Sequence, residues 1–231
     1  MELKQKKNTS KSKMSEHKIE PFVIGMTGLS GAGKSFYVNA LKSRLGDLVS
    51  VVGFDDYYKP LEFQEVDQHG EANYDLPTAL YSDKFHEDLL QLLEYHPVMI
   101  KKYQFEHYDA PEVVEPIYPA PILLVEGLFV MEFEAVDRLL DYRVFIDCDL
   151  ELCFERRLAR DIAERNIPRN RSLHQWEHHV MPAYEQFILP HKTRCDLVVE
   201  NHGPADYNIQ KIIDTVKLIS HPTVSQLLGG V

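Results

Sequence analysis

Short, continuous apolar runs alternate along the chain with longer segments whose apolar residues recur at helical spacing. The short runs are rich in Val and Ile and are bounded by Gly, Pro, Asp or Asn, a pattern that predicts strands buried on both faces. These runs are FVIGMTG, LVSVVGF, APILLVEG, YRVFID and CDLVVEN. The segments with helical spacing are 34–45, 78–95, 149–165, 172–190 and 205–219.

This alternation predicts an α/β fold in which a doubly wound, mainly parallel five-stranded sheet is flanked by helices. Ligands of such sheets bind beyond the C-terminal ends of the strands. The longest irregular piece, residues 59–78, is too long for a simple connection and predicts a substrate-binding excursion. We expect a single domain over residues 21–231, because 231 residues can bury one sizeable core.

The first twenty residues differ from the rest in charge and apolar content. They hold six lysines against three acidic residues, and they are too poor in apolar side chains to offset the entropy lost on ordering. We predict a disordered basic tail over residues 1–20, with contact to an anionic partner as the less favoured alternative. The remainder carries a net charge of −14 (19 basic minus 33 acidic residues), which argues against general nucleic-acid binding.

Cysteine usage and hydropathy bear on the compartment. Cys148, Cys153 and Cys195 lack metal-ligand spacing and cannot all pair with one another, as is typical of a reducing cytosol. No run approaches the roughly 18 apolar residues of a membrane-spanning helix, and the N-terminus lacks the apolar core of a signal peptide. We therefore expect a cytoplasmic protein without a membrane partner.

The most specific motif follows the first predicted strand. GLSGAGKS, residues 28–35, fits G-x-x-x-x-G-K-[ST] at every defined position and opens a predicted helix. Its glycines let the backbone fold closely around phosphate, so that amide N–H groups face the anion. Lys34 is expected to reach the β and γ phosphates, and Ser35 to hold Mg²⁺. The segment predicts a P-loop that binds ATP or GTP.

P-loops serve ATPases, GTP switches and small-molecule kinases. The N-K-x-D segment that reads guanine in GTP switches is absent from the chain. A kinase needs a carboxylate to take the proton of the acceptor hydroxyl, and Asp55 and Asp56 directly follow the second predicted strand. Glu126 ends the third strand, where it can orient a metal-bound water. A turn or helix-cap role is the alternative for these acids.

Arginines cluster on one predicted helix and just after it. Six of the ten in the chain lie between positions 156 and 171: Arg156, Arg157, Arg160, Arg165, Arg169 and Arg171. A helix folding over the phosphates supplies charge to the transferring group and excludes water, so we predict a lid over residues 151–175. The alternative is a solvated face that pairs with acids at helical spacing, and we expect about half of the arginines to serve each purpose. Those acids are Glu151, Glu155, Asp161 and Glu164.

Together these motifs resemble those of the uridine kinase and phosphoribulokinase family of P-loop kinases, over residues 22–203. GLSGAGKS matches the family loop, DDYYKP its D-S-[FY]-Y-[KR] segment, NYDLPTAL its N-[FY]-D-x-P-x-A-[FL] segment, and LLVEGLF its strand followed by E-G-[IL]. FIDCDLELCFERRLARDIAER is similar to the lid segment, and HHVMPAYEQFILPHKTRCDLVV to the C-terminal signature. Several of these matches are weak alone, but their order and spacing are specific.

The resemblance implies a P-loop NTPase-type fold, Mg²⁺ as cofactor, ATP or GTP as donor, and roles for individual residues. Asp55 aligns with the catalytic aspartate, expected to activate a 5′-hydroxyl, and Asp75 with the carboxylate that binds ribose hydroxyls. The implied catalytic residues are Asp55, Lys34, Arg157 and Arg160. The implied phosphate-binding residues are Gly28, Ser30, Gly31, Ala32, Gly33, Lys34, Ser35 and Arg165. The implied acceptor-binding residues are Tyr58, Tyr74, Asp75, Tyr103, Phe105, His107, Arg157 and Gln175. The implied metal-binding residues are Ser35, Asp55 and Glu126.

Two segments depart from the family pattern. Uridine kinases carry Y-x-[FY]-x-x-H-[ST]-R around the base, whereas here YQFEHYD places His107 one residue early with no arginine after it. In the lid, E-R-G-R is replaced by ERNI, which leaves Arg169 or Arg171 as candidate replacements for the lost arginine. The doubled aspartate followed by aromatic residues also resembles nicotinamide riboside kinases.

We therefore expect ATP-dependent phosphorylation of a nucleoside 5′-hydroxyl, with uridine or cytidine as the favoured acceptor. Nicotinamide riboside, pantothenate and sugar phosphates are the alternative acceptors within the same superfamily. A nucleotide-sensing protein without phosphoryl transfer is disfavoured, because Lys34, Ser35, Asp55 and Asp75 are all present. The expected partner is a small molecule, and homo-oligomerisation stays open.

Overall fold

The computed structural model describes residues 20–106, 110–202 and 205–229, so the tail predicted over residues 1–20 lies almost wholly outside it. A five-stranded sheet has the order β2-β5-β1-β6-β7, and every neighbouring pair in it is parallel. Each strand lies within one of the predicted apolar runs, which confirms the doubly wound α/β class. The strands are β1 (Phe22–Gly28), β2 (Val49–Gly53), β5 (Ile122–Glu126), β6 (Tyr142–Asp147) and β7 (Leu197–Glu200).

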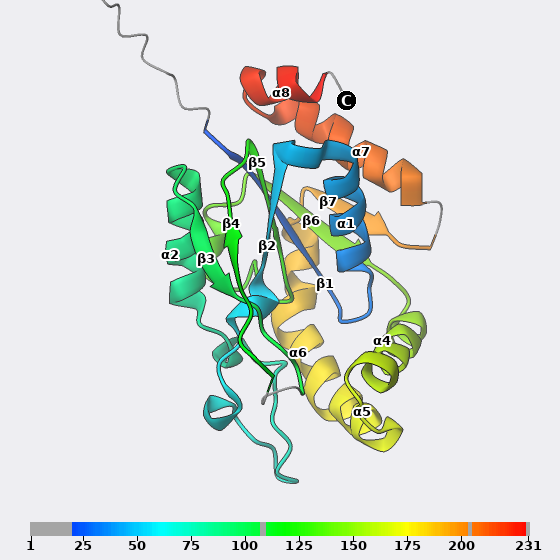
Figure 1. Ribbon diagram of the computed structural model, residues 1–231. Helices are drawn as coiled ribbons and strands as arrows, with labels where there is room; N and C mark the ends of the chain where they lie inside the picture. Colours follow the sequence, from blue (N-terminus) through cyan, green and yellow to red (C-terminus); the bar gives the residue numbers. More distant parts are fainter. Residues whose placement is uncertain (1–19, 107–109, 203–204, 230–231) are drawn as a thin grey trace, which may run out of the picture.

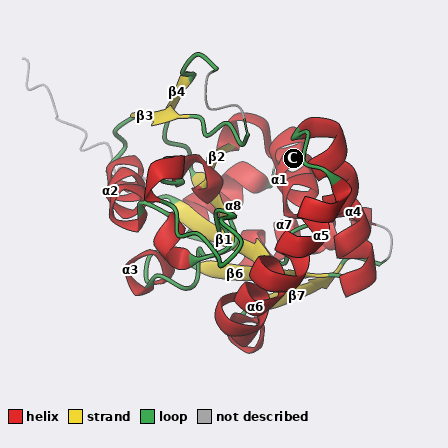
Figure 2. Cartoon of the chain, turned by 90° about the horizontal axis from the view of Figure 1, so that it is seen from below, coloured by secondary structure: helices red, strands yellow, loops and turns green. Residues whose placement is uncertain are grey.

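Helices cover both faces of this sheet. Figure 1 and Figure 2 show α1 (Lys34–Leu45) and α7 (Ala205–Ile219) together on one face, with the segment around α6 (Met181–Ala183) on the other. Because both faces are covered, every residue of β1 is buried, as its continuous apolar run predicts. The other α-helices are α2 (Ser82–Leu93), α3 (Glu134–Asp137), α4 (Leu150–Glu164), α5 (Arg169–Gln175) and α8 (Pro222–Leu228).

The helix predicted at 172–190 is longer and less regular than its pattern indicates. After α5 the chain makes a π-helical turn (Trp176–Val180), passes through α6, makes a second π-helical turn (Tyr184–Ile188) and ends in a 3₁₀ segment (Leu189–Arg194). Each π turn inserts an extra residue into the helix and so changes which side chains share a face. Among the described residues, no helix combines the length and apolar content needed to cross a membrane.

An antiparallel hairpin was not predicted. It pairs β3 (Val98–Lys101) with β4 (Val114–Ile117) and projects beside β2 in Figure 2. The sequence gives little sign of β4, because its residues are mostly exposed and include Glu115 and Pro116. The excursion at 59–78 is irregular, as predicted, apart from the 3₁₀ turns Leu61–Phe63 and Pro77–Ala79. The second of these turns delays the start of α2 to Ser82.

Strand register gathers the predicted site residues at one edge of the sheet. Glu126 ends β5 and is paired with Met26 of β1 on one side and with Gly53 of β2 on the other. The P-loop begins just beyond Met26, and Asp55 lies in the 3₁₀ turn Phe54–Tyr57 just beyond Gly53. Parallel pairing therefore brings the loop, Asp55 and Glu126 together at the C-terminal edge, where ligands of such sheets bind.

Candidate active site

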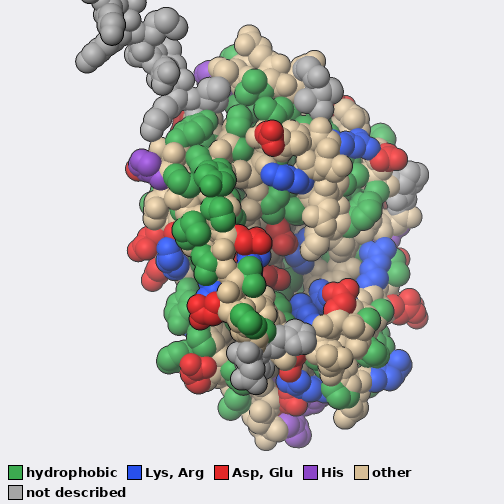
Figure 3. Space-filling model, viewed as in Figure 1, with side chains coloured by type: hydrophobic (Ala, Val, Ile, Leu, Met, Phe, Trp, Pro, Cys, Tyr) green, Lys and Arg blue, Asp and Glu red, His purple; other side chains and the backbone are tan. Residues whose placement is uncertain are grey.

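A cavity of about 290 Å³ lies at this edge. Figure 3 shows acidic and basic side chains gathered around the hollow in the middle of one face of the molecule. Its walls come from the P-loop, the turn after β2, the 59–78 excursion, residues 105 and 106, and the α4–α5 segment. The predicted site residues that line it are Ser30, Gly31, Gly33, Lys34, Ser35, Asp55, Tyr58, Tyr74, Asp75, Phe105, Glu126, Arg157, Arg160, Arg165 and Gln175.

The other predicted residues lie elsewhere. Gly28 and Ala32 belong to the loop and do not line the cavity. Tyr103 packs against Phe105 but faces a neighbouring groove. His107 lies outside the described residues.

The P-loop backbone has the shape that its glycines predict. Gly31 has φ of 85°, and a Cβ there would lie 2.2 Å from the carbonyl oxygen of Cys153, so α4 packs directly on the loop. Gly33 has φ of 101° and caps the start of α1. Only glycine adopts such angles without strain. The loop is therefore held open toward the cavity at the N-terminus of a helix, which attracts anions.

Asn201, just after β7, is hydrogen-bonded to the backbone of the P-loop. Its side-chain amide donates to the carbonyl of Ala32 at 2.8 Å and accepts from the Tyr37 hydroxyl at 3.3 Å. A Cβ on Gly33 would lie 2.6 Å from the same amide nitrogen. The sequence offered no signal for this residue, because it is far from the loop along the chain.

Lys34 is partly buried, close to two carboxylates. Its ammonium donates to the carbonyls of Gly28 and Leu29 at 3.0 and 3.3 Å. Burial lowers the pKa of Lys34, while the nearby Glu126 and Asp55 carboxylates partly oppose that shift. The lysine is thus held by the loop itself, within reach of an anion in the cavity.

Asp55 and Glu126 bring two neighbouring carboxyl groups to the cavity beside Lys34. Burial raises the pKa of Asp55, against the effect of Lys34. Burial, followed by the charge of Asp55, raises the pKa of Glu126 to about 7. Two carboxylates and the hydroxyl of Ser35 line the same cavity. Hard oxygen donors of this kind are what Mg²⁺ prefers, so the residues present fit this ion.

A buried carboxylate on α4 organises the arginines above the cavity. Asp161 is fully buried, and its oxygens lie 3.3 Å from Arg157 Nε, 3.6 Å from Arg160 Nη2 and 3.5 Å from Arg165 Nη1. It also accepts from the Ser172 hydroxyl at 2.8 Å. The prediction that placed Asp161 on a solvated face is therefore wrong: its face is turned inward, where one carboxylate serves three guanidinium groups.

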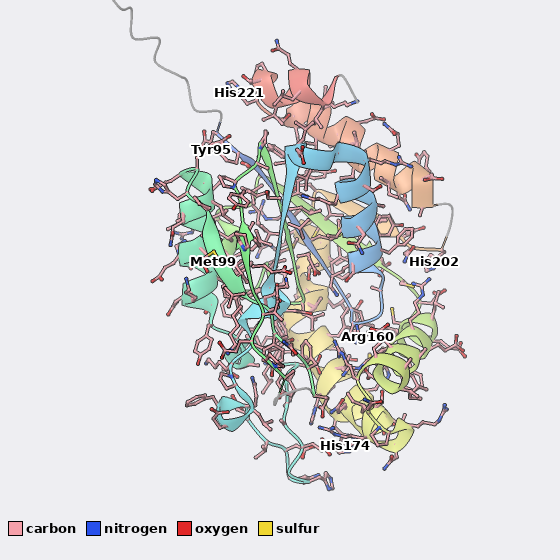
Figure 4. The ribbon with its side chains drawn as sticks, in the orientation of Figure 1. Tyr95, Met99, Arg160, His174, His202 and His221 are labelled. Atoms are coloured by element: carbon pink, nitrogen blue, oxygen red, sulfur yellow. The ribbon has the colours of Figure 1, made fainter. Side chains whose placement is uncertain are left out.

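These arginines carry an excess of positive charge. Burial and the neighbouring Arg165 and Arg157 lower the pKa of Arg160. Arg157 and Arg160 both donate to the hydroxyl of Ser30 in the P-loop, at 3.0 and 3.3 Å. Figure 4 shows Arg160 at α4, beside the loop. Arg165 lines the same cavity, with its guanidinium 4.3 Å from the centre of the Phe105 ring, so two guanidinium groups at the loop and a third beside them form an anion site.

Arg169 and Arg171 do not replace the missing lid arginine. Arg169 is exposed and, like Arg171, does not line the cavity. The Arg171 guanidinium binds Glu71 at 2.6 Å and Glu106 at 3.0 Å, and so ties the excursion and the 103–106 segment to α5.

The far side of the cavity is aromatic with one buried carboxylate. The rings of Tyr58, Tyr74, Tyr103 and Phe105 are in mutual contact, with Tyr58 and Phe105 centroids 5.1 Å apart. Buried Asp75 lies 3.8 Å from Arg157, which also donates to Gln175 at 3.5 Å. Burial and the charges of Asp55 and Asp75 raise the pKa of Tyr58, so its hydroxyl keeps its proton. This wall can stack a flat ring and bind hydroxyl groups.

Asp56 plays a different part from Asp55. One of its oxygens forms an ion pair with Lys102, and the other accepts from the backbone N–H of Tyr103 at 3.2 Å. The adjacent carboxylates thus diverge: Asp55 faces the cavity, and Asp56 fixes the segment that carries Tyr103 and Phe105.

Comparison with known proteins adds the family. Residues 23–207 match the sequence profile of the Phosphoribulokinase / Uridine kinase family. The chain belongs to this family. The family is one of kinases, and the match confirms the resemblance expected from the motifs.

The relatives cover most of the chain. The uridine kinase of Leuconostoc citreum is 33% identical over 188 residues, which are 80% of this chain and 90% of that protein. The uridine kinase of Lactiplantibacillus plantarum is 32% identical over 208 residues, 89% of this chain and 100% of that protein. A solved structure of a possible uridine kinase from Bacillus stearothermophilus has a TM-score of 0.56 at 18% identity, covering 80% of this chain and 92% of that one. At that identity the last match supports the fold alone.

Proposed function

We propose that this family member transfers the γ-phosphoryl group of ATP to the 5′-hydroxyl of a pyrimidine nucleoside, uridine or cytidine. The observation that carries the proposal is one cavity with two chemically different walls. One wall is the P-loop with Lys34, and the other is the aromatic cluster with Asp75. The relatives named uridine kinase, at 32–33% identity, support this acceptor over others.

On the donor side, charge stabilisation is the main task of the chain. The P-loop N–H groups bind the phosphates, and Lys34, Arg157 and Arg160 stabilise the charge that spreads over the transferring group. We propose that α4 and α5 act as a lid, in which Asp161 keeps the arginines pointing at the loop. GTP is the alternative donor, since the P-loop binds the phosphates and not the base.

On the acceptor side, Asp55 is the proposed general base. Its raised pKa makes it a stronger proton acceptor than an ordinary aspartate, and it lines the cavity near both Lys34 and Tyr58. We assign Asp75 and Arg157 to the ribose hydroxyls, and Tyr74 and Phe105 to stacking on the nucleobase; all four line the cavity. Ser35, Asp55 and Glu126 would hold Mg²⁺, which, when bound, neutralises phosphate charge during transfer.

Other acceptors are the alternatives. The departure of YQFEHYD from the uridine kinase pattern leaves nicotinamide riboside, pantothenate and sugar phosphates open. The aromatic wall favours acceptors with a flat ring, which are the pyrimidine nucleosides and nicotinamide riboside. Sugar phosphates and pantothenate offer less surface for stacking. A nucleotide-binding protein without phosphoryl transfer is disfavoured, because the general base Asp55 and the acceptor wall are both present.

An acceptor panel tests the proposal. Uridine, cytidine, nicotinamide riboside, pantothenate and ribulose 5-phosphate are each incubated with ATP and Mg²⁺, and monophosphate formation is measured. We expect turnover of uridine or cytidine, and a loss of roughly 10²–10⁴-fold in Asp55→Ala with nucleotide binding retained. Asp83→Ala, an exposed aspartate on α2, is the matched control. Turnover of another acceptor alone would replace the nucleoside, and ATP loss independent of any acceptor would favour the binding protein.

A further inference from the structure

A histidine cluster lies at the edge of the cavity, where the 59–78 excursion meets the helix after α4, and one member, His179, also lines the cavity. Asp67 comes from the excursion, and His174 and His179 come from α5 and the π turn that follows. One ligand atom from each residue lies within 4.8 Å of the other two. The side chains of Asp67 and His174 are 17% and 22% exposed, and that of His179 only 2%. The cluster is therefore a partly enclosed site and not a surface patch.

The excursion presents Asp67 in a fixed orientation. Its Oδ1 accepts from the backbone N–H groups of His69 and Glu71 at 2.8 and 3.0 Å, within a tight turn closed by the Val66–Ala72 bridge. Its Oδ2 is directed at the helix, 2.6 Å from Nε2 of His174 and 3.0 Å from Nε2 of His179. One carboxylate oxygen and two imidazole nitrogens thus converge on one point.

The π-helical turn makes this convergence possible. In a regular α-helix, residues five apart point about 140° away from each other. The turn Trp176–Val180 follows His174 and contains His179; it widens the helix, so that residues five apart come to the same side. Such turns carry an energetic cost and occur frequently at functional sites. Here the turn aims both rings at Asp67.

We infer that Asp67, His174 and His179 form a binding site for a Zn²⁺-class transition-metal ion. Two imidazoles and one carboxylate are a donor set that Zn²⁺ accepts, and Mg²⁺ and Ca²⁺ prefer oxygen alone. On binding, the ion replaces any proton carried on each Nε2, which shifts to Nδ1 or is released to solvent, and no group is oxidised or reduced. His69, whose ring centroid is 5.0 Å from that of His174, is placed to become a fourth ligand.

The bound ion would join two walls of the cavity. The excursion that carries Asp67 also carries Asp75, and the helix that carries His174 also carries Gln175. Figure 4 shows His174 at the end of the molecule where α5 and the excursion meet. Metal binding should therefore stiffen the acceptor side while leaving the P-loop unchanged.

A titration with Zn²⁺ tests the site on the full chain, which is first stripped of metal by a chelator and kept free of nucleotide. Excess Mg²⁺ is present throughout, so that it occupies the oxygen ligands at Ser35, Asp55 and Glu126. The single tryptophan, Trp176, lies between the two histidines and reports binding by its fluorescence; calorimetry gives the stoichiometry. We expect one ion per chain, and a visible absorption band of low-coordinate Co²⁺ when Co²⁺ replaces Zn²⁺.

Variants separate a metal site from a set of hydrogen bonds. His174→Gln can still donate an N–H to Asp67 but is a poor ligand, so it should fold normally and lose more Zn²⁺ affinity than the roughly 10–100-fold that loss of an outer-shell partner costs, as should Asp67→Asn. His96→Ala, an exposed histidine outside the cluster, should bind as the parent does. Asp55→Asn should also keep its Zn²⁺ affinity, which excludes the catalytic carboxylates as the site. Zn²⁺ affinity unchanged in His174→Gln and Asp67→Asn, or no binding by the parent protein, would overturn the inference and leave a hydrogen-bonded clasp.

Discussion

The two walls of the cavity are built in opposite ways. The phosphate wall comes mainly from one continuous segment, GLSGAGKS, whose backbone alone gives it shape. The acceptor wall takes single side chains from four segments: Tyr58 from the turn after β2, Asp75 from the excursion, Phe105 from beyond the hairpin strand β3, and Gln175 from α5. Backbone sites are fixed by local sequence, whereas assembled sites depend on long-range packing.

The arginines of α4 connect the two walls. Arg157 reaches Ser30 of the P-loop, Asp75 of the acceptor wall and Asp161 of its own helix. A change at this connection should therefore disturb both walls, and a change on one wall should affect one substrate. The following predictions test that division, from the largest expected effect to the smallest.

Asp161→Asn is expected to have the largest effect. Removing the charge leaves three guanidinium groups without their shared carboxylate, so we expect a loss of about 3 kcal/mol in the free energy of unfolding. Misplaced arginines should also lower kcat by roughly 100-fold. Urea unfolding and steady-state kinetics measure the two effects. Glu155→Gln, on the exposed face of the same helix, is the control. If the two variants have the same free energy of unfolding and the same kcat, Asp161 does not position the arginines.

Lys102→Met should affect the acceptor wall alone. It breaks the ion pair with Asp56, which holds the segment of Tyr103 and Phe105, so we expect KM for the acceptor to rise about tenfold. KM for ATP should stay unchanged, because no P-loop contact is altered. Lys101→Met is the matched control, since that neighbour pairs with exposed Glu112. A parallel rise in KM for ATP would show that the two walls are not separable.

Glu126→Gln, on the phosphate wall, should change how the free energy of unfolding depends on pH. In the unfolded chain this glutamate ionises near its ordinary value of 4.5, and in the folded protein its pKa is about 7. Between these values the folded state binds more protons, so the glutamate makes the protein less stable as pH rises from about 4.5 to 7. The glutamine variant should lose this part of the pH dependence and part of the stabilisation by Mg²⁺.

Urea unfolding across this pH range, with and without Mg²⁺, measures the difference. Glu151→Gln, exposed in the first turn of α4, should keep the slope of the parent protein. If Glu126→Gln keeps it as well, Glu126 is not the group that titrates there. Asp55, whose pKa is raised too, would then be the next candidate.

Sequence patterns were most informative where one element carries its own signal. The strands buried by helices on both faces read as continuous apolar runs, and α1 begins and ends at the predicted residues. The hairpin β3–β4 was not predicted, because its second strand is mostly exposed and no alternation of apolar and polar residues marks a buried face. The π turns were not predicted, because the spacing of apolar residues around them differs little from that of an α-helix.

The same distinction holds for the site. Lys34 and Asp55 could be singled out from motifs that follow strands, because parallel strands end at one edge. Asp161 was placed on the wrong face, since its neighbours Glu155 and Glu164 are exposed and its own burial depends on the packing of α5. Asn201 and the Asp67 cluster gave no signal, because each acts on residues over a hundred positions away.

The sequence by itself determined the sheet, the phosphate loop and the residue types available for phosphoryl transfer, because these depend on local periodicity and backbone geometry. Only the tertiary structure decided how the adjacent acids divide: Asp55 enters the cavity while Asp56 fixes a distant segment. It also decided which arginines face the loop and that two histidines meet an aspartate. Such choices depend on contacts between segments far apart in the chain, and packing energy, not local propensity, selects them.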